Sequence, residues 1–357
     1  MFAMRKKLLV GVDIGTHSIK LAYLKPKGKG YQLLNFGIMP LRHEAVVDGN
    51  IAEAEAIVEA IRNLIRMEKI KSKDVATAIS GQSVIVKRIR VPRMTEQELT
   101  EAIPGEAEQH IPFEISDVHI DFQILPTFLD EGERADNQMD VLLVAARKTK
   151  VRDYSNILTA AGLNPVIVDI DVFALENEHE VTTASDDLGV VALVDIGATT
   201  MNINILKAGS TLFQRDIAIG GHRYTTAIQK ALNVDYQEAE ALKMGCGLSE
   251  KRTQDEVLSL MAGVSEEIGE EIQRSFEFFR TTAADEVIDR MVISGGCAKI
   301  RGLDRFLSNR LGLPVSVADP FRGLYYSEKF FDPEYLHDMA PMAAVSVGLA
   351  LRRMHDR

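Results

Sequence analysis

Cysteine is scarce in this sequence of 357 residues, and its two copies, Cys246 and Cys297, lie far apart. No Cys-x-x-Cys pair occurs, so neither a structural zinc site nor a disulfide framework is supported. A chain of this length can bury a large core and does not need such staples. The scarcity of cysteine fits a reducing compartment.

Positive charge is also in short supply, because 41 Lys and Arg face 52 Asp and Glu, for a formal net charge of −11. Nucleic-acid binding draws much of its affinity from Lys and Arg contacts to phosphate, so we expect no nucleic-acid partner. The 46% apolar and 26% charged residues are typical of a globular protein. The length predicts two or three domains.

Long apolar runs are missing as well: none approaches the roughly 18 residues that a membrane-spanning helix needs. The N-terminus carries basic residues before an apolar stretch, but Leu8 to Val12 is too short for a signal peptide. We therefore expect a cytoplasmic protein that reaches a membrane only through a partner, without direct membrane insertion.

An internal repeat is the most informative feature that is present. Residues 8–24 (LLVGVDIGTHSIKLAYL) and 190–206 (VVALVDIGATTMNINIL) align without gaps at an offset of 182, which pairs Asp13 with Asp195. Each unit is an apolar run, an Asp-Ile-Gly turn and a second run of alternating character, which predicts a β-hairpin. A repeat half the chain long indicates two similar domains rather than a solenoid.

Strand and helix patterns alternate along the rest of the chain, which predicts an α/β protein. Apolar spacing predicts helices around 57–65 and 255–281, and Thr95 with Glu98 forms a capping-box pattern for a helix that starts near 96. We expect Pro104–Gly105 to break or kink that helix. The polar segments 131–140 and 182–189 are predicted as an exposed loop and a linker. Predicted strands are 74–80, 84–91, 118–126, 140–146, 165–170 and 288–294.

The two Asp-Ile-Gly turns are the best candidates for chemistry. Glycine-rich turns can aim backbone N–H groups at an anion, and residues 15–18 and 197–200 add hydroxyl groups. Two such hairpins face to face would clamp a polyphosphate, with Asp13 and Asp195 orienting the waters of a bound Mg²⁺. Lys20 would neutralise phosphate charge, although a strand lysine is usually solvated. For a single copy, a turn in which Asp caps its own backbone is the simpler interpretation.

Four weaker signals leave alternatives open. Gly295 and Gly296 follow a strand and suit either a flat ligand or a tight turn. Gly220 and Gly221 precede a helix and either present its N-terminus to phosphate or form a loop. Glu240 and Lys243 share a helix face, as a ligand pair or as an exposed ion pair of little worth.

The fourth signal is a pair of carboxylates, Asp169 and Asp171, at the end of a strand, where either one activates a water or caps the next helix. No nucleophile constellation is present, because the chain has no Gly-x-Ser-x-Gly and no His-Glu-x-x-His pattern.

In this order the motifs resemble the superfamily of actin, sugar kinases and heat-shock chaperone ATPases. Its two phosphate hairpins correspond to 11–22 and 193–204, its first connecting segment to 165–175, its adenosine loop to 292–303 and its second connecting helix to 339–352.

Within the superfamily the chain is similar to the PilM family, cytoplasmic actin-like proteins of type IV pilus assembly. The segments that carry the similarity are 106–118 (EAEQHIPFEISDV), 161–175 (AGLNPVIVDIDVFAL), 219–232 (IGGHRYTTAIQKAL), 270–279 (EEIQRSFEFF) and 311–324 (LGLPVSVADPFRGL). It also resembles FtsA, which is usually longer and carries a C-terminal membrane helix that we do not expect here.

The resemblance implies an actin-like ATPase fold: two lobes with a duplicated RNase H-like core and an FtsA-type 1C subdomain. The implied subdomains are 1A at 1–84 and 165–188, 1C at 85–164, 2A at 189–228 and 285–357, the latter including the adenosine loop and connecting helix, and 2B at 229–284.

The resemblance also implies ATP and Mg²⁺ in the cleft between the lobes. Asp13, Asp171 and Asp195 are the implied catalytic carboxylates, with Asp13 and Asp195 reaching the metal through water. The implied cofactor-binding residues are Gly15, Thr16, His17, Ser18, Lys20, Gly197, Ala198, Thr199, Thr200, Gly221, Glu240, Lys243, Gly295, Gly296 and Ala298. His17 and His222 depart from the family pattern, where small polar residues are usual.

The implied function is an ATP-binding scaffold that binds the cytoplasmic N-terminal peptide of PilN, in a groove between 1A and 1C, and couples nucleotide state to the inner-membrane complex of twitching motility. Other pilus components, including assembly ATPases, and homo-oligomers are further implied partners. The alternatives are an FtsA-like filament-forming division protein and a sugar-kinase-like phosphotransferase. Whether the protein hydrolyses ATP is left open, and at most we expect slow turnover.

Overall fold

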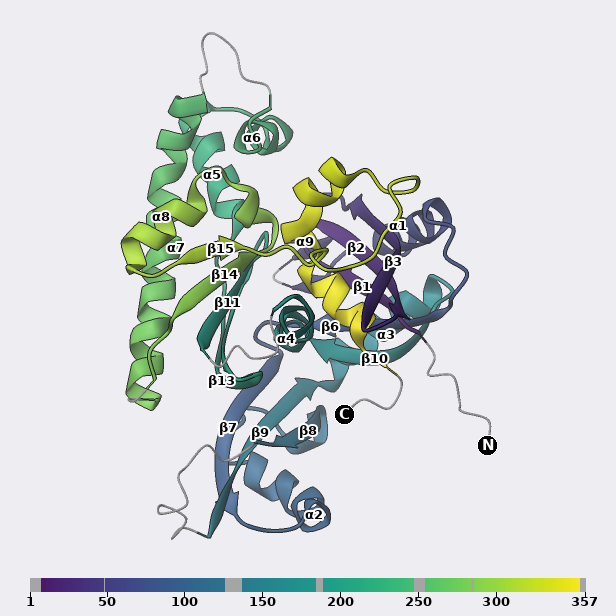
Figure 1. The fold of residues 1–357 in the computed structure, drawn as a ribbon, viewed down its shortest axis with the longest axis vertical. Coiled ribbons are helices and arrows are strands. Elements are labelled where there is room, and N and C mark those ends of the chain that lie inside the picture. The colour runs from purple at the N-terminus through teal and green to yellow at the C-terminus, as the bar shows by residue number, and fades with distance from the viewer. Residues whose placement is uncertain are drawn as a thin grey trace.

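The computed structural model describes residues 8–47, 49–125, 137–183, 189–246, 254–283 and 286–353. Its centre is a pair of five-stranded sheets (Figure 1). The first sheet has the order β10-β6-β1-β2-β3, and the second has the order β13-β12-β11-β14-β15. The strands of the first are β1 (Val10–Ile14), β2 (Ser18–Lys27), β3 (Gly30–Pro40), β6 (Asp74–Ile79) and β10 (Asn164–Ile170). Those of the second are β11 (Val190–Ile196), β12 (Met201–Lys207), β13 (Ser210–Ile217), β14 (Arg290–Ser294) and β15 (Val315–Val317).

The two sheets are copies of one topology, which confirms the duplication that the repeat predicts. In each, a hairpin pairs antiparallel and its first strand also pairs parallel with a later strand, β6 in one sheet and β14 in the other. The hairpins even share their register, since Asp13 lies opposite Lys20 and Asp195 lies opposite Asn202. The strands β1 and β11 are almost wholly buried, as expected for the apolar runs of central strands.

Helices cover the outer faces of both sheets. On the first sheet lie α1 (Ala54–Met67) and α3 (Lys148–Ala160), whose apolar faces join one hydrophobic core with it. On the second lie α5 (Gly221–Leu232), α6 (Tyr236–Lys243), α7 (Gln254–Thr282) and α8 (Leu303–Leu311). We call each sheet with its helices a lobe. The predicted helices around 57–65 and 255–281 are confirmed as α1 and α7.

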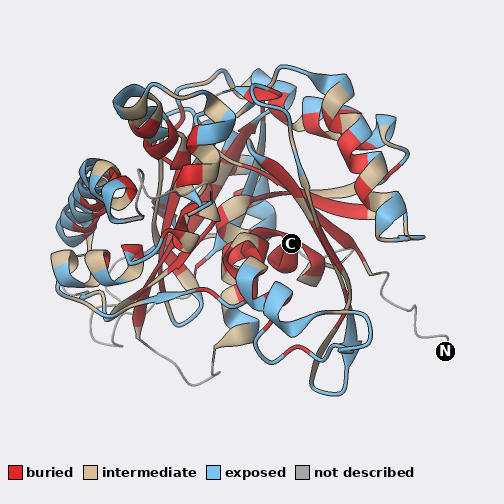
Figure 2. Cartoon of the chain, turned by 90° about the horizontal axis from the view of Figure 1, so that it is seen from above, coloured by how far each residue is buried: buried red, intermediate tan, exposed pale blue. Residues whose placement is uncertain are grey.

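Two helices lie between the lobes, α4 (Asp171–Thr182) and α9 (Pro333–Leu351) (Figure 1). Small and aliphatic side chains from both helices share a buried core with residues of β6 and β11. The view from above shows buried residues concentrated in these central helices and in the strands beside them (Figure 2). At their crossing, a Cβ added to Gly348 of α9 would lie 1.8 Å from the carbonyl oxygen of Ala174 in α4. Only glycine lets the two backbones come so close.

A separate sheet of three strands, in the order β7-β9-β8, lies beyond the first lobe (Figure 1). Its strands are β7 (Val84–Pro92), β8 (Val118–Ile124) and β9 (Gln138–Arg147), and the helix α2 (Glu96–Ala107) packs on it through Leu99, Ile103 and Ala107. The capping box of Thr95 and Glu98 is confirmed. Of the predicted break or kink at Pro104–Gly105, the break is wrong, because the helix continues through the proline to Ala107. Buried Ile103 and Ala107 anchor it on both sides of the proline.

Two loop predictions need correction or fall outside the described residues. The segment 131–140 was predicted as an exposed loop, but Gln138–Asp140 begins β9, and the buried carboxylate of Asp140 pairs with Arg88 at 2.7 Å. Residues 131–136 lie outside the described residues, and so does most of the predicted linker, residues 184–188. The predicted strands all occur, with ends shifted by at most a few residues.

Short elements complete the fold: the hairpin of β4 (Val46–Val47) and β5 (Asn50–Ile51), and the 3-10 helices η1 (Ile115–Asp117) and η2 (Gly296–Lys299). Across the ranges that the structure describes, none of the helices has both the length and the apolar character needed to cross a bilayer.

The crossing of α4 and α9 yields a prediction. We expect Gly348→Ala to lower the free energy of unfolding by about 1–3 kcal/mol or more, because the added methyl group overlaps the backbone of α4. Gly263→Ala in α7 is the matched control, since its Cβ would meet nothing within 4 Å and alanine favours a helix by up to about 1 kcal/mol. Urea unfolding measures both. Equal stability of the two variants would contradict the close crossing.

Candidate functional site

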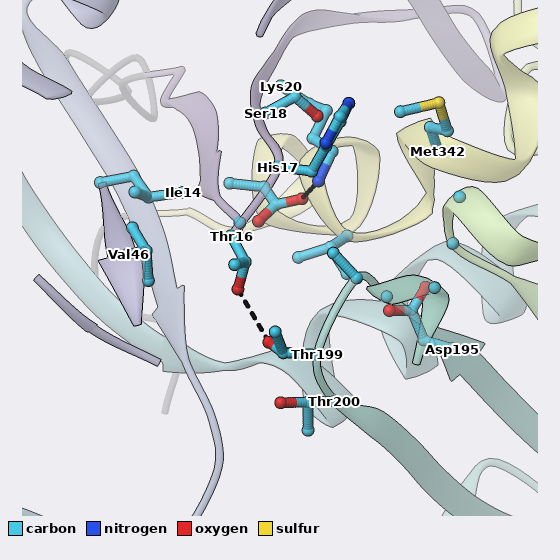
Figure 3. Close-up of a pocket in the computed structure, with 18 of the residues that line it drawn as sticks. Ile14, Thr16, His17, Ser18, Lys20, Val46, Asp195, Thr199, Thr200 and Met342 are labelled. Carbon is cyan, nitrogen blue, oxygen red and sulfur yellow. Dashed lines mark hydrogen bonds and ion pairs between the residues drawn. The ribbon is translucent and has the colours of Figure 1, made fainter. Parts of the chain in front are cut away.

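The turns of the two repeated hairpins meet face to face. The hydroxyl groups of Thr16 and Thr199, 183 positions apart, are hydrogen-bonded at 2.9 Å (Figure 3). Both turns line one cavity of about 370 Å³, which also receives residues from α3, α6, η2 and α9. The structure therefore brings the duplicated motifs together around a single space.

Each turn is closed by the same backbone hydrogen bond. The N–H of Gly15 donates to the carbonyl of Ser18 at 3.2 Å, and the N–H of Gly197 donates to the carbonyl of Thr200 at 2.9 Å. Within these turns the hydroxyl groups of Thr16 and Thr199 point toward one another (Figure 3). The equal turns follow from the equal registers of the two hairpins.

Three carboxylates and one lysine line the cavity beside the turns. Lys20 lies on β2 opposite Asp13, and its Nζ is 3.1 Å from Asp13 Oδ2. Burial opposes the charge of Lys20, but the Asp13 carboxylate prevails and raises the lysine pKa above its usual value. Lys20 is therefore a buried ion-pair partner rather than a solvated strand residue.

Asp195 and Asp171 occupy the same region. Asp195 Oδ1 accepts a hydrogen bond from Ser294 Oγ at 2.7 Å, and burial raises the pKa of Asp195. Burial, with a smaller contribution from the negative charge of Asp13, raises the pKa of Asp171 to about 7. A carboxyl group with a pKa near neutrality can both take up and release a proton there.

Glu240 and Lys243 of α6 form a shielded pair that lines the cavity on the side of the second lobe. Their side chains are only 16% and 10% exposed, and Lys243 Nζ lies 2.6 Å from Glu240 Oε1. Thr225 of α5 bonds to both. Burial raises the pKa of Glu240, but the charge of Lys243 outweighs it and the net shift is downward. The two residues line the cavity, which rules out the exposed-pair interpretation.

The glycine pair after β14 shapes the cavity wall. Gly295 has a φ of 82°, and a Cβ there would lie 2.5 Å from the carbonyl oxygen of Ile196. At Gly296 a Cβ would meet nothing within 4 Å, so this residue leaves open space on the cavity side. Ala298, predicted beside them, is buried but does not line the cavity, whereas its neighbours Cys297 and Lys299 do.

The N-terminus of α5 is bound to the second hairpin. The N–H of Gly221 donates to the carbonyl of Gly197 at 2.9 Å, and the N–H of His222 donates to that of Ala198 at 2.8 Å. Gly221 lines the cavity as predicted, but its N–H already has a partner. The helix terminus therefore positions the second turn and does not present these two donors to a phosphate.

Asp169 is not a site residue. Its carboxylate binds Arg352 at the end of α9, with Nε to Oδ2 at 2.6 Å and Nη2 to Oδ1 at 3.0 Å. Asp169 is 3% exposed, and it tethers β10 to the central helix instead of activating water. Neither Asp169 nor Asp171 caps α4, which starts after Ile170 without a side-chain cap.

Several residues that line the cavity were not predicted from the sequence. Asn202 is the repeat partner of Lys20, so the alignment of the hairpins could have found it. The contributions of α3 and α9 carry no local signal, because they come from helices whose cavity side is visible only in the fold. These residues are Lys150, Tyr154, Met339, Met342 and Val345.

Two further contacts join the lobes near the cavity. Gly81, in the loop after β6, donates its N–H to Asp216 Oδ2 of β13 at 2.7 Å. The ring of His43 packs against that of Tyr236 in α6 in a tilted arrangement, with 3.9 Å between centroids, and the Tyr236 hydroxyl lies 3.2 Å from His222 Nε2. Burial lowers the pKa of both His17 and His222. The two histidines that depart from the family pattern are thus shielded imidazoles.

The donor set fits the magnesium nucleotide that the resemblance implies. Ser18 Oγ and Asn202 Nδ2 are buried, belong to cavity-lining residues and have no hydrogen-bond partner among the described residues. Buried polar groups without a partner are costly, so they suit a polar ligand. Carboxylate oxygens such as those of Asp13 and Asp195 suit the hydrated Mg²⁺ ion.

The bond between Asp169 and Arg352 gives a stability prediction. Arg352→Met leaves a buried carboxylate uncompensated, and we expect it to lower the free energy of unfolding by about 3–5 kcal/mol. Adding Asp169→Asn should restore much of that loss, because the charge is removed together with its partner. Chemical unfolding of the two single variants and the double variant forms a cycle. Additive losses would contradict the pairing.

Comparisons with known proteins agree with this geometry. A model of the family described as type IV pilus assembly protein PilM matches residues 11–354. In a solved PilM-PilN type IV pilus biogenesis complex, one chain is 30% identical, with a TM-score of 0.86, over 98% of this chain and 100% of that one. Cell division protein FtsA of Escherichia coli K12 is 24% identical over 91% of this chain and 89% of FtsA.

A more distant likeness concerns the fold alone. The structure of MreB5 of Spiroplasma citri bound to ADP has a TM-score of 0.53 and 13% identity, over 96% of this chain and 94% of that one. The predicted actin-like ATPase fold is confirmed by these neighbours. Because the family match extends over nearly the whole chain, the protein belongs to the PilM family of type IV pilus assembly proteins.

Proposed function

We propose that the protein is an ATP-binding, actin-like scaffold of type IV pilus assembly. One observation carries the nucleotide part: two hairpins of equal register meet at Thr16 and Thr199 across a single cavity. Turns of this kind bind phosphate through hydroxyl and backbone N–H groups, and two opposed turns suit a chain of phosphates. The nucleotide-bound state of the MreB5 structure is consistent with such a ligand in this fold.

In this proposal, different cavity residues contact different parts of the nucleotide. Thr16, Ser18, Thr199 and Thr200 offer hydroxyl groups to phosphate, and Lys20 offers charge. Asp13 and Asp195 would hold Mg²⁺ through its water shell, and Glu240, Lys243 and the Gly295–Gly296 turn would contact ribose and base. Bound Mg-ATP would supply a triphosphate between the two turns. Its presence or loss would determine whether the two turns have a shared ligand.

Hydrolysis, if it occurs, would rely on Asp171. This carboxyl group lines the cavity, and burial raises its pKa to about 7, so it can accept a proton from a water near neutral pH. The other described carboxylates of the cavity already have partners: Asp13 pairs with Lys20, Asp195 accepts a hydrogen bond from Ser294, and Glu240 pairs with Lys243. We therefore infer a nucleotide-binding protein with, at most, slow ATPase activity.

Nucleotide retention tests the site. Purified protein should retain ATP or ADP, measured by mass spectrometry of the denatured supernatant, and Asp13→Ala and Asp195→Ala should retain less because Mg²⁺ loses its anchor. Gly296→Leu should also lose nucleotide, because its side chain would enter the cavity where a Cβ meets no atom within 4 Å.

The control for bulk is Gly105→Leu in α2, where a Cβ likewise meets nothing within 4 Å but lies away from the cavity. It should retain nucleotide like the unmodified protein, and thermal melting should show that all four variants fold. Unchanged nucleotide content in the Asp13, Asp195 and Gly296 variants would refute the assignment.

The partner that we propose is the cytoplasmic N-terminal peptide of PilN. The support is the 30% identity and full-length superposition with the chain from the PilM-PilN complex. We place the peptide in a groove between the first lobe and the three-stranded sheet, the unit that we propose as subdomain 1C. An extended peptide with apolar side chains suits such a groove. Through PilN the protein would be held at the inner membrane, peripheral to it.

Calorimetry with the full chain tests the partner. Titration of a synthetic PilN N-terminal peptide from the same genome should give a saturable heat, whereas a scrambled peptide of equal composition should give none. Co-purification of the chain with full-length PilN in detergent provides a second measurement. The absence of heat together with failed co-purification would remove PilN from the proposal and leave the nucleotide site standing.

A further inference from the structure

The cavity has four lysines among its described lining residues, and three of them are already neutralised. Lys20 pairs with Asp13 at 3.1 Å, Lys243 with Glu240 at 2.6 Å and Lys299 with Asp338 at 2.9 Å. Lys150 is the exception, since no described carboxylate lies within ion-pair distance of its ammonium group. Among the described lysines that line the cavity, Lys150 is thus the one without a carboxylate partner among the described residues.

Lys150 is nevertheless buried. Only 6% of the residue is exposed, and its Nζ donates to the carbonyl of Gly49, next to the ring of Tyr154 at 4.8 Å from the centroid. Burial lowers the pKa of Lys150, and the nearby carboxylates of Asp171 and Asp153 only partly offset this. Keeping a cation in such a place is costly unless an anion joins it.

The position of Lys150 within the cavity indicates which anion. Residues of α6, η2 and α9 form one end, where Lys299 Nζ lies 3.9 Å from Met339 Sδ. Lys150, Tyr154, Val46 and Gly49 come from the first lobe and form the other end. Val46 and Met342 lie on opposite sides of the hairpin residues in Figure 3, and α3 and α6 belong to different lobes in Figure 1.

A nucleotide whose base lies at the α6 end and whose phosphates follow the hairpins therefore extends toward Lys150. We propose that Lys150 binds the third phosphate of ATP and makes the cavity discriminate between a nucleoside triphosphate and a diphosphate. This rests on the proposed function, because it assumes the nucleotide site and its orientation. In the diphosphate-bound state the ammonium group keeps the Gly49 carbonyl, and in the triphosphate-bound state it turns to the phosphate.

Affinity for two nucleotides tests the proposal. Calorimetry with nucleotide-free full-length protein and Mg²⁺ compares the non-hydrolysable AMPPNP with ADP. For Lys150→Gln we expect AMPPNP affinity to fall at least about tenfold, the value of one charge-assisted hydrogen bond, with ADP affinity unchanged. Lys148→Gln is the matched control, since this exposed lysine lies in the same helical turn and donates to the carbonyl of Ser116 at 2.7 Å.

A measurement on the unmodified protein covers the case in which Lys150→Gln does not fold. Reductive methylation followed by peptide mass spectrometry should show Lys150 protected by AMPPNP and not by ADP, with Lys148 labelled equally in both. Equal labelling of Lys150 in the two states, or an unchanged ratio of affinities in a folded Lys150→Gln variant, would overturn the proposal. Failure of the unmodified protein to bind either nucleotide would instead overturn the proposed function, and this inference with it.

Discussion

The close crossing of α4 and α9 is the constraint on which the cavity depends. Gly348 lets α9 touch the backbone of α4, and on the neighbouring face a Cβ at Gly11 of β1 would lie 2.1 Å from the carbonyl of Ser346. The helix α9 therefore packs directly on the backbones of both α4 and β1. With these backbones in contact, the turns of the two hairpins meet within hydrogen-bonding distance.

The duplicated halves share a backbone but not a charge pattern. In the first hairpin a carboxylate faces a lysine, and the pair of Asp13 and Lys20 is neutral as a unit. In the second hairpin Asn202 takes the place of that lysine, and Asp195 relies on the hydroxyl of Ser294. The second hairpin therefore lacks the cation that the first hairpin carries opposite its aspartate.

Much of this architecture could be predicted from the sequence because its signals are local or repeated. The offset between Asp13 and Asp195 predicted two equal hairpins, and Thr95 with Glu98 predicted the start of α2. The choice of partners over long distances could not be predicted. No local pattern around Asp169 predicts its partner Arg352, which lies 183 positions later. The sequence therefore suggested Asp169 as a residue that could activate water, whereas its carboxylate binds Arg352.

The predicted helix break at Pro104 and the predicted loop around Asp140 are wrong for a similar reason. Proline lacks one backbone donor, but the packing of Ile103 and Ala107 on the three-stranded sheet outweighs that loss, and packing is invisible in local composition. The polar residues around Asp140 predicted an exposed loop, because charged side chains usually lie on the surface. In the fold its carboxylate is matched by Arg88 across the strand pair.

The three-stranded sheet is joined to the rest of the chain by two covalent connections, and each lies close to a residue that lines the cavity. The chain enters the sheet just after Gly81, whose N–H is held by Asp216 of the opposite lobe, and leaves it just before Lys150. A small rotation at these two attachment points would swing the far edge of the sheet as a lever arm. The position of the far edge of the sheet therefore depends on the cavity wall near Gly81 and Lys150.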